Sequence, residues 1–376
     1  MQILIDAAKT VAWVENRQSL PNGQMRYALS GIGIKEAEIA FSSSGYIGVA
    51  PVPLAQYVDV VLQQTSRNTQ ITKPRMEERF KNLMFSEDLT SAIGPALNST
   101  KPILIYGVPG VGKSFLCRHL NKLFGDDVFI PAAIEIHGHI IQVYDAQVHI
   151  LANSPLQKSN GEISLTLEVG HDPRWHLCER PLIVTGGELT GSMLEVQYDA
   201  TGRTYKAPLQ LKANNGLLLI DDLGRQKITP VEIFNRWIIP LEERRDFLSL
   251  PNGVHFEMPF ELILLFSTNL DPASLVDEAF LRRLGYKIEF KPLELANYKT
   301  LWFDVCNDNT LACSEVAFDY LINKYHHPTQ KPFLPCIPRD LLSIISDQIK
   351  FNQLEFVVDE SLIDRAWNHY FVSPKS

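Results

Sequence analysis

The sequence predicts an α/β protein in which helices cover both faces of a parallel β-sheet, followed by an all-helical subdomain. Two observations support this fold class. From Pro102 onward, short continuous apolar runs bounded by turns alternate with helical patterns, which is typical of strands buried on both faces. Beyond Pro292 the strand patterns stop, and residues 293–371 show successive helical patterns instead.

The individual elements follow from local patterns. Strands are predicted at residues 103–106, 217–220, 261–267 and 287–290, where the apolar runs lie. Helices are predicted at 114–124, ending at Gly125, and at 231–244. A hairpin is predicted at 246–258, because its Asn-Gly pair favours a tight two-residue turn. Shorter helical patterns occupy 35–41 and 75–85.

These patterns divide the chain into three parts. Residues 1–70 are predicted to be a short N-terminal leader that includes a Pro-containing arm, because Pro51 and Pro53 favour extended backbone around them. Residues 71–291 form the α/β core. A long insert at about 132–211 is predicted to contain two hairpins, at 134–144 and 194–205. Residues 292–376 form the helical lid subdomain.

Composition restricts the function classes. The formal net charge of −8 argues against non-specific binding to nucleic acid or to anionic membranes. The cysteine count of 5 is odd and includes no C-x-x-C pair, which favours a reducing compartment. No apolar run approaches the ~18 residues that span a bilayer, and residues 1–13 lack a signal-peptide pattern. We therefore expect a cytoplasmic protein without a membrane span.

A phosphate-binding loop follows the first predicted strand. Residues 107–114 fit the pattern G-x-x-x-x-G-K-[ST], in which glycines let backbone N–H groups face phosphate oxygens. Lys113 is predicted to reach the β- and γ-phosphates of ATP, and the Ser114 hydroxyl to bind Mg²⁺. The alternative, a glycine-rich turn, does not explain the strand before the loop and the helix after it. The predicted nucleotide-binding residues are Gly107, Val108, Pro109, Gly110, Val111, Gly112, Lys113, Ser114 and Phe115.

Two carboxylates follow the second predicted strand. Asp221 is expected to hold Mg²⁺ together with Ser114, and Asp222 to polarise the attacking water. Many P-loop ATPases carry Glu at the second position, so the shorter Asp222 leaves the rate of hydrolysis open. An Asp-Asp pair at a strand end is otherwise a common turn. Its place downstream of a P-loop favours the catalytic interpretation.

Further candidate catalytic residues lie beyond this pair. Asn269 ends the next strand, where a neutral amide can orient water against the γ-phosphate; the alternative is a helix cap. Arg282 and Arg283 end a short helix and are candidate arginine fingers for a neighbouring subunit, the alternative being surface arginines. Arg339 opens a helix of the lid subdomain and is predicted to reach the phosphate of its own subunit.

The order and spacing of these motifs resemble those of AAA+ ATPases. The counterparts are Walker A at 107–114, Walker B at 217–222, sensor 1 at Asn269, the arginine finger and sensor 2 at Arg339. The hairpin at 246–258 resembles the presensor-1 hairpin of a large AAA+ superclade. This resemblance implies an ATPase that assembles into a ring, with a hexamer as the expected form.

A closer resemblance concerns a bacterial family of predicted ATPases with chaperone activity, associated with Flp-type pilus assembly. It runs from about residue 45 to the C-terminus, and in that family the Walker B strand also ends in Asp-Asp. The segments that resemble the family are 46–54, 180–190, 207–214, 223–226, 235–241 and 266–272.

Three functional hypotheses follow. The first is an ATP-hydrolysing, chaperone-like ring that remodels or helps assemble an unknown protein partner in pilus or secretion processes. The second is a nucleotide-controlled assembly scaffold with slow hydrolysis. The third is a nucleic-acid motor, which the acidic balance and the absence of a recognisable nucleic-acid-binding motif disfavour.

Overall fold

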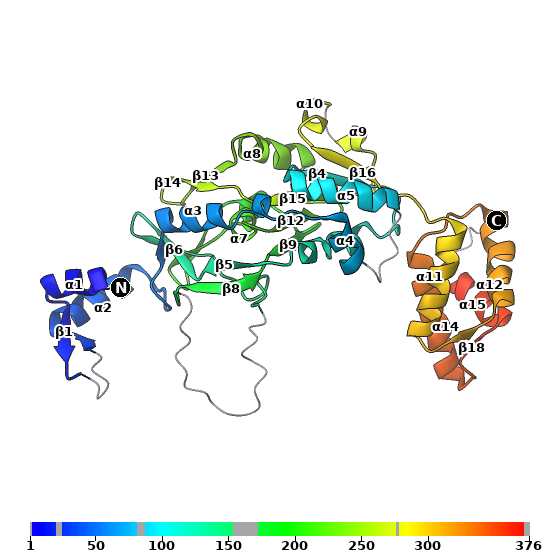
Figure 1. The fold of residues 1–376 in the computed structure, drawn as a ribbon, viewed down its shortest axis with the longest axis horizontal. Helices are drawn as coiled ribbons and strands as arrows, with labels where there is room; N and C mark the ends of the chain where they lie inside the picture. Colours follow the sequence, from blue (N-terminus) through cyan, green and yellow to red (C-terminus); the bar gives the residue numbers. More distant parts are fainter. Residues whose placement is uncertain (1, 20–24, 81–86, 153–171, 276–277, 372–376) are drawn as a thin grey trace.

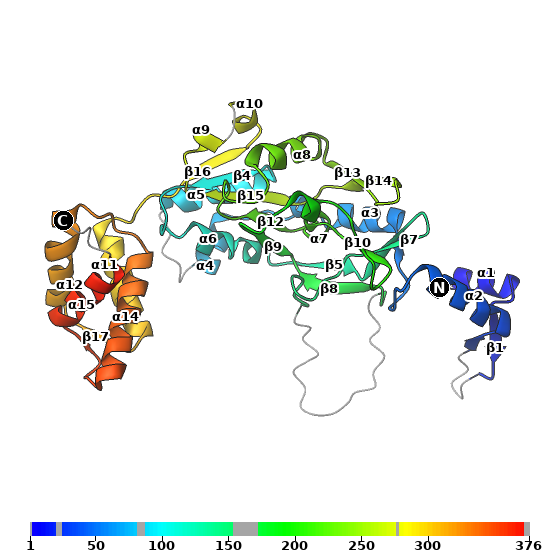
Figure 2. The same ribbon diagram turned by 180° about the vertical axis from the view of Figure 1, so that it is seen from behind.

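The computed structural model describes residues 2–19, 25–80, 87–152, 172–275 and 278–371. An N-terminal unit, a central body and a helical subdomain follow one another along the long axis of the molecule (Figure 1). The view from behind shows the same order, with the helical subdomain beside β4 and β16 of the central body (Figure 2). The part of the central body that holds β13 and β14 lies toward the N-terminal unit.

The main sheet of the central body is five-stranded and parallel throughout, in the order β16-β4-β15-β12-β9. The strand that precedes the P-loop, β4, therefore lies second in the sheet, next to the strand that ends before Asn269. The predicted parallel α/β core with helices on both faces, the hairpin at 246–258 and the following helical subdomain are confirmed. The strands are β4 (Ile103–Tyr106), β9 (Leu182–Thr185), β12 (Leu217–Ile220), β15 (Ile263–Thr268) and β16 (Tyr286–Glu289).

Alternation along the strands explains how the main sheet is buried on both faces. Leu217 and Leu219 of β12 belong to one apolar cluster, whereas Leu218 and Ile220 belong to another. Successive side chains of a strand point to opposite faces, so a continuous apolar run serves two cores. The first cluster includes residues of α5 (Glu87–Ser99) and α6 (Lys113–Cys117), and the second includes residues of α8 (Pro230–Glu243).

Local signals set the ends of the helices. The Thr229 side chain accepts a hydrogen bond from the Glu232 N–H, and the Glu232 carboxylate accepts one from the Thr229 N–H, forming a capping box at the start of α8. The helix predicted at 114–124 is shorter: α6 ends at Cys117, and a 3₁₀ turn, Leu120–Leu123, follows. There, the His119 ring contacts the Phe115 carbonyl oxygen at 2.7 Å, where a continuing α-helix would place a backbone N–H.

A second five-stranded sheet, in the order β10-β11-β7-β6-β3, packs beside the main sheet. The two predicted hairpins are both present, and a parallel β11–β7 pairing joins them into one sheet. The long-insert prediction is wrong in one respect, because β9 lies within 132–211 and is the edge strand of the main sheet. The hairpin strands are β6 (Ala133–Ile136), β7 (His139–Gln142), β10 (Gln197–Asp199) and β11 (Thr204–Lys206).

Additional two-stranded elements complete this side of the central body. β5 (Asp127–Pro131) pairs with β8 (Trp175–Glu179). The presensor hairpin predicted from Asn-Gly is formed by β13 (Arg245–Ser249) and β14 (His255–Pro259). Residues from these elements and from the second sheet share one apolar cluster.

The central body also contains shorter helices, which are α4 (Lys73–Arg79), α7 (Leu209–Lys212), α9 (Pro272–Leu275) and α10 (Glu278–Leu281). Residues 81–85 of the pattern predicted at 75–85 lie outside the described residues.

The predicted Pro-containing arm is wrong for residues 52–63. β3 (Val52–Pro53) pairs in parallel with β6, and α3 (Leu54–Gln63) follows directly. Tyr57 and Val61 lie one turn apart on α3 and are buried against the second sheet. Pro53 occupies the N-cap position, where its missing N–H removes no helical hydrogen bond. Prolines fit both the start of a helix and an extended segment, so the sequence pattern does not distinguish these two structures.

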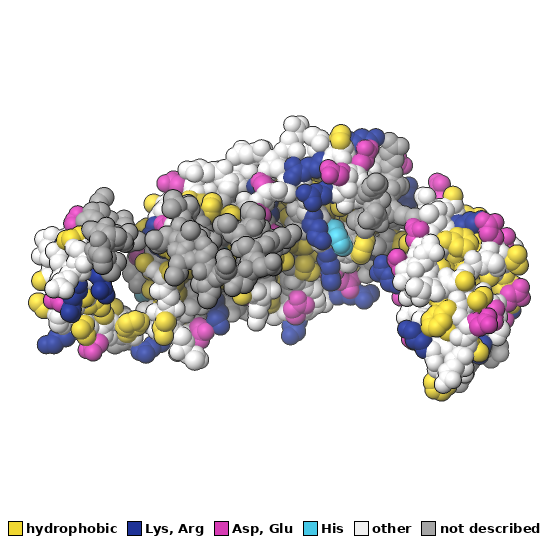
Figure 3. Space-filling view, turned by 60° about the horizontal axis from the view of Figure 1, so that its bottom comes forward, with side chains coloured by type: hydrophobic (Ala, Val, Ile, Leu, Met, Phe, Trp, Pro, Cys, Tyr) yellow, Lys and Arg dark blue, Asp and Glu magenta, His cyan; other side chains and the backbone are white. Residues whose placement is uncertain are grey.

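The N-terminal unit, residues 2–43, forms its own small fold. It contains α1 (Gln2–Thr10), the antiparallel pair β1 (Val14–Arg17) and β2 (Arg26–Leu29), and α2 (Gly31–Ser43). The Ser30 side chain caps α2 by accepting a hydrogen bond from the Gly33 N–H at 3.0 Å. Several large apolar side chains of this unit are exposed, and apolar side chains are visible on its surface (Figure 3).

The helical subdomain packs around a separate apolar core. Its helices are α11 (Leu295–Asp308), α12 (Glu315–Leu321), a π-helical turn Ile322–His326, α13 (His327–Thr329), α14 (Cys336–Asn352) and α15 (Glu360–Tyr370). One short parallel pair, β17 (Ala312–Cys313) with β18 (Val357–Val358), departs from the all-helical prediction.

We propose that the apolar core of the helical subdomain marks a separate lid domain. We also propose that the central body begins near β3 and not at residue 71. In the part of the chain that the structure describes, no helix is both long and apolar enough to cross a membrane.

Candidate functional site

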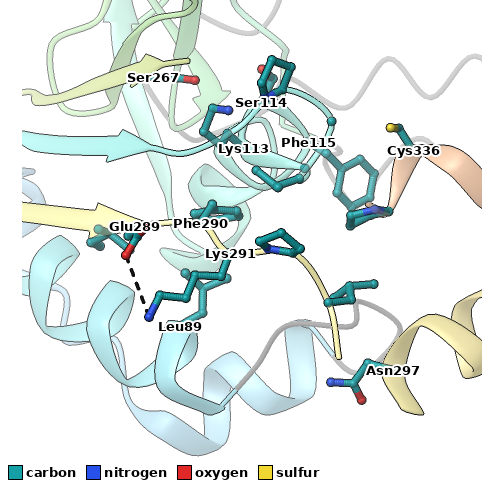
Figure 4. Close-up of a pocket in the computed structure, with 18 of the residues that line it drawn as sticks. Leu89, Lys113, Ser114, Phe115, Ser267, Glu289, Phe290, Lys291, Asn297 and Cys336 are labelled. Carbon is teal, nitrogen blue, oxygen red and sulfur yellow. Dashed lines mark ion pairs between the residues drawn. The ribbon is translucent and has the colours of Figure 1, made fainter. Parts of the chain in front are cut away.

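A cavity of about 1500 Å³ lies between the P-loop edge of the main sheet and the helical subdomain. Residues 109–115, Asp221, Asp222 and Asn269 line it from the central body. Arg339 and Cys336 of α14 line it from the helical subdomain, together with residues of α11. Figure 4 shows Lys113 and Ser114 on the P-loop, with Phe115 facing Cys336. The tertiary structure thus gathers most of the predicted site residues around one cavity.

The backbone of the P-loop requires glycine. Gly110 has φ +84°, a left-handed conformation that residues with a Cβ rarely adopt. A Cβ at Gly110 would lie 2.5 Å from the Cys336 sulfur, and one at Gly107 would lie 2.3 Å from the Phe290 carbonyl oxygen. The loop therefore packs closely against both Phe290, the residue directly after β16, and the first turn of α14. Gly107 and Val108 do not themselves line the cavity, although both belong to the predicted binding motif.

Lys113 is held at the base of the loop. Its ammonium group donates hydrogen bonds to the carbonyl oxygens of Gly107 at 2.7 Å and Val108 at 3.0 Å, and to Asn269 Oδ1 at 2.7 Å. The residue is only 6% exposed, and this burial lowers the pKa of the ammonium group despite the nearby Asp221 and Asp222. A cation so placed is positioned to meet an anion that enters the cavity.

Ser114 and Asp221 meet at the end of β12. The Ser114 hydroxyl donates to Asp221 Oδ1 at 2.9 Å, and the Asp222 N–H contacts the same oxygen at 3.1 Å. Hydroxyl and carboxylate oxygens are the ligands that Mg²⁺ prefers, and it binds proteins through few of them. The pair therefore fits the predicted magnesium site without rearrangement of the backbone.

Asp222 adopts an uncommon backbone conformation, with φ +56°. Its carboxylate accepts a hydrogen bond from Asn269 Nδ2 at 2.8 Å and lies 3.6 Å from the Arg225 guanidinium. Because Asn269 also accepts from Lys113, the amide connects the P-loop lysine to this carboxylate. Two strand ends, of β12 and β15, bring these groups together at one edge of the sheet.

Arg339 lies on the opposite wall of the cavity. Its guanidinium is 5.6 Å from the centre of the Phe115 ring, within the range of a cation–π contact. Cys336, one turn earlier on α14, donates its backbone N–H to the Gly110 carbonyl oxygen at 3.3 Å. These contacts connect the helical subdomain to the P-loop at Gly110 and at Phe115.

Arg282 and Arg283 lie away from the cavity of their own chain. Arg282 pairs with Glu278 at 2.7 Å and is 75% exposed. Arg283 pairs with Glu242 of α8 at 2.8 Å and is half-buried. Both follow α10, and neither lines the cavity. The structure therefore does not bring the two arginines to the P-loop of the same subunit.

The sequence-based predictions missed three residues that contact the site. Gln226 donates to the carbonyl oxygens of Asp221 and Asp222, and Arg225 pairs with the Asp222 carboxylate. Both lie within five residues of Asp221 and Asp222 in the sequence, so this proximity could have identified them as site residues. Cys336 precedes Arg339 by one helical turn, which places the two on the same face of α14. Once Arg339 is a candidate, this spacing in the sequence indicates Cys336 as well.

Comparisons with known proteins add little beyond the geometry. A family described as a domain of unknown function (DUF8689) matches residues 294–369, within the helical subdomain. The comparison with curated proteins finds no match. Among solved structures, NtrX from Brucella abortus is 11% identical, with a TM-score of 0.49 over 91% of this chain and 62% of that one.

A structure of NtrX in complex with ATP has a TM-score of 0.44 at 11% identity, covering 90% of this chain and 64% of that one. The Thermotoga maritima RuvB Holliday junction branch migration motor has a TM-score of 0.44 at 12% identity, covering 77% of this chain and 70% of that one. The chain thus spans under two thirds of the NtrX length. Likenesses at this level carry no argument about what this chain binds or does.

Proposed function

We propose that this chain binds ATP with Mg²⁺ in the cavity beside the P-loop and hydrolyses it to ADP and phosphate. The observation that carries the proposal is the contact series Lys113–Asn269–Asp222 beside the Ser114–Asp221 pair. It combines one buried cation for phosphate, two oxygen ligands suited to Mg²⁺, and a carboxylate with a neutral amide neighbour. Phosphoryl transfer depends mainly on such positioning and electrostatic stabilisation.

Each residue has a distinct part in this proposal. Lys113 would contact the β- and γ-phosphates, and Ser114 and Asp221 would hold Mg²⁺, which would neutralise charge on the phosphate oxygens. Asp222 accepts a hydrogen bond from the attacking water, and Asn269 orients that water. Arg339, which lines the cavity from the helical subdomain, would approach the phosphates from that side.

We further propose that the active form is a ring, with a hexamer as the expected form. Arg282 and Arg283 line no part of their own cavity, and Arg282 is largely exposed. This position outside their own cavity is the one expected of arginines that act on the nucleotide of a neighbouring subunit. Head-to-tail contacts that close on themselves generate a ring.

The proposed task is the remodelling or assembly of a protein partner, in a cytoplasmic setting. The resemblance to the chaperone-like, pilus-associated family supports this choice, and the net charge of −8 disfavours a nucleic-acid motor. Stimulation of hydrolysis by a protein fraction supports the remodelling hypothesis. Stimulation by DNA or RNA with a steep dependence on salt would replace it with the motor hypothesis.

One observation favours the second candidate function, a nucleotide-controlled scaffold with slow hydrolysis. The Asp222 carboxylate already contacts Asn269 and lies near Arg225, and its side chain is shorter than Glu. A carboxylate engaged in this way is less available to a water molecule. Under this alternative, nucleotide binding controls assembly and hydrolysis only resets it.

The decisive experiment separates binding from hydrolysis. Lys113→Ala is expected to weaken ATP binding roughly 100-fold, because a charge-assisted contact contributes about 1.5–3 kcal/mol. Asp222→Asn is expected to retain the wild-type affinity and to lose about 100-fold or more in turnover, because an amide is a poor base. Calorimetry measures the affinity and phosphate release measures the turnover.

Lys206→Ala is the matched control, since Lys206 pairs with Asp199 on the second sheet, away from the cavity. It should leave both quantities unchanged. Unchanged ATP affinity in Lys113→Ala would refute the nucleotide site. A wild type that binds ATP but shows no turnover alone, as assembled rings or with partner fractions would favour the scaffold.

A further inference from the structure

Two cysteines of the helical subdomain lie next to each other across a tight turn. Cys306 is in the last turns of α11, and Cys313 is the second residue of β17. The Leu311 N–H donates to the Cys306 carbonyl oxygen at 2.9 Å, and Thr310 adopts a left-handed conformation with φ +55°. This turn folds β17 back onto α11, so the side chains of the two free cysteines lie near each other.

The surroundings of Cys313 favour its thiolate. The indole N–H of Trp302 donates to the Cys313 sulfur at 3.3 Å, and Trp302 is fully buried, so this donor is held in place. The neighbouring Cys306 thiol, followed by the Trp302 donor, lowers the pKa of Cys313 although burial opposes the shift. The Cys313 thiol also donates to the Ser314 carbonyl oxygen at 3.6 Å.

The other cysteines lack this combination. Cys117 and Cys178 are fully buried, and burial raises the pKa of both thiols. Burial also raises the pKa of Cys336. Cys306 is 1% exposed, and the neighbouring Cys313 and burial raise its pKa. Cys313 is partly exposed, so it combines thiolate character with access to small reagents.

We propose that Cys313 is a redox modification site that reacts with hydroperoxides, and that Cys306 resolves the product into an intramolecular disulfide. This inference is independent of the proposed ATPase activity. It rests on the turn that joins the two thiols, the buried indole donor and the partial exposure of only one of the pair.

The proposed reaction has two balanced steps. The Cys313 thiolate attacks one oxygen of a hydroperoxide, so that an S–O bond forms, the O–O bond breaks, and the leaving hydroxide or alkoxide takes a proton. Cys306 then attacks the sulfur of the sulfenic acid. The S–S bond forms, the S–O bond breaks, and the departing hydroxide leaves as water with the Cys306 proton. Two thiols are oxidised, and one peroxide is reduced.

The position of the pair gives the disulfide a structural consequence. Val305 and Asp308, on either side of Cys306, line the cavity beside the P-loop. A disulfide would attach this end of α11 covalently to β17, which pairs with β18 near the end of α14. Oxidation would therefore restrict the cavity wall contributed by the helical subdomain.

The first test is reactivity by mass spectrometry on the full chain. Both cysteines lie in one tryptic peptide, residues 300–324, because no Lys or Arg separates Lys299 from Lys324. In the folded protein, iodoacetamide should modify Cys313 about tenfold faster at pH 7 than the same cysteine in the urea-unfolded chain. After hydrogen peroxide, this peptide should become lighter by two hydrogen atoms and resist alkylation until it is reduced.

Matched variants separate the two roles. Cys306→Ser retains a hydroxyl donor but removes the resolving sulfur, so peroxide should leave a sulfenic acid at residue 313 that dimedone captures. Cys313→Ser should abolish both the rapid alkylation and the disulfide. Trp302→Phe, checked for folding by circular dichroism, should slow the alkylation of Cys313. Cys117 and Cys178 serve as unreactive internal references in each digest.

Two results would overturn the proposal. One is a Cys313 that is alkylated no faster in the folded chain than in the unfolded one at pH 7. The other is a disulfide at 300–324 that peroxide produces only after the chain has been unfolded. Either result would mean that the folded environment does not activate the pair.

Discussion

Asn269 is the residue through which Lys113 and Asp222 are connected, since its amide accepts from one and donates to the other at 2.7 and 2.8 Å. Asn269→Ala removes both contacts without adding charge. We expect turnover to fall roughly 10- to 100-fold, as for the loss of one preorganised polar group in a catalytic site. ATP affinity should change less than about threefold, because Lys113 keeps its two carbonyl contacts. Phosphate release and calorimetry on the same preparation measure the two effects. Ser249→Ala, which alters only an exposed hairpin contact with His255, serves as the control. Equal losses in affinity and turnover would mean that Asn269 supports nucleotide binding rather than the chemical step.

Helix α3 is the element whose role differs most from the prediction, and it defines where the central body begins. Its Tyr57 hydroxyl accepts a hydrogen bond from Asn214 at 2.8 Å, and Gln64, directly after the helix, bonds the backbone of Phe129 on β5. Removal of residues 1–43 should leave the unfolding temperature of the central body within about 2 °C. Removal of residues 1–64 should lower it by at least about 5 °C. Burial of Tyr57 and Val61 contributes roughly 2 kcal/mol each, and 1 kcal/mol shifts the midpoint by about 2–4 °C at this size. Scanning calorimetry of both truncated proteins decides the matter. Identical unfolding temperatures for the two truncated proteins would mean that α3 belongs to the N-terminal leader and not to the central body.

At the scale of the whole molecule, the arginines after α10 predict dependence on a neighbouring subunit. Arg283→Ala should bind ATP normally but lose turnover by a factor of about 10³ or more, as expected for an arginine finger. Lys113→Ala should be inactive for a different reason. An equal mixture that assembles at random contains intact P-loops facing intact arginines at about a quarter of its interfaces, so activity should partly return. A mixing titration followed by phosphate release measures this. Arg245→Ala, an exposed arginine on β13 paired with Glu257, should remain active throughout. If mixed rings form but phosphate release does not recover, Arg283 does not act on the nucleotide of the neighbouring subunit.

The sequence by itself determined the features that depend on local chemistry. The P-loop from Gly107 to Ser114 is recognisable because its glycine conformations, its lysine and its hydroxyl are adjacent along the chain. Asp221 and Asp222 follow a strand whose apolar run is uninterrupted, and parallel strands present such ends at one edge of the sheet. The Asn-Gly turn between β13 and β14 likewise depends on two neighbouring residues. In each case the decisive interactions lie within a few residues of one another, so a pattern can record them.

Only the tertiary structure decided which distant segments meet. β9 has a short apolar pattern like many others, and its place at the edge of the main sheet depends on pairing with β12, more than thirty residues later. β3 and α3 belong to the central body because β6 and Asn214 contact them, which no feature near Pro51 or Pro53 indicates. Cys336 of the helical subdomain contacts Gly110 of the P-loop, and Trp302 contacts Cys313 across a turn. The physical reason is that these contacts depend on burial and shape complementarity between separate elements. A pattern of neighbouring residues does not reveal which distant elements will pack together.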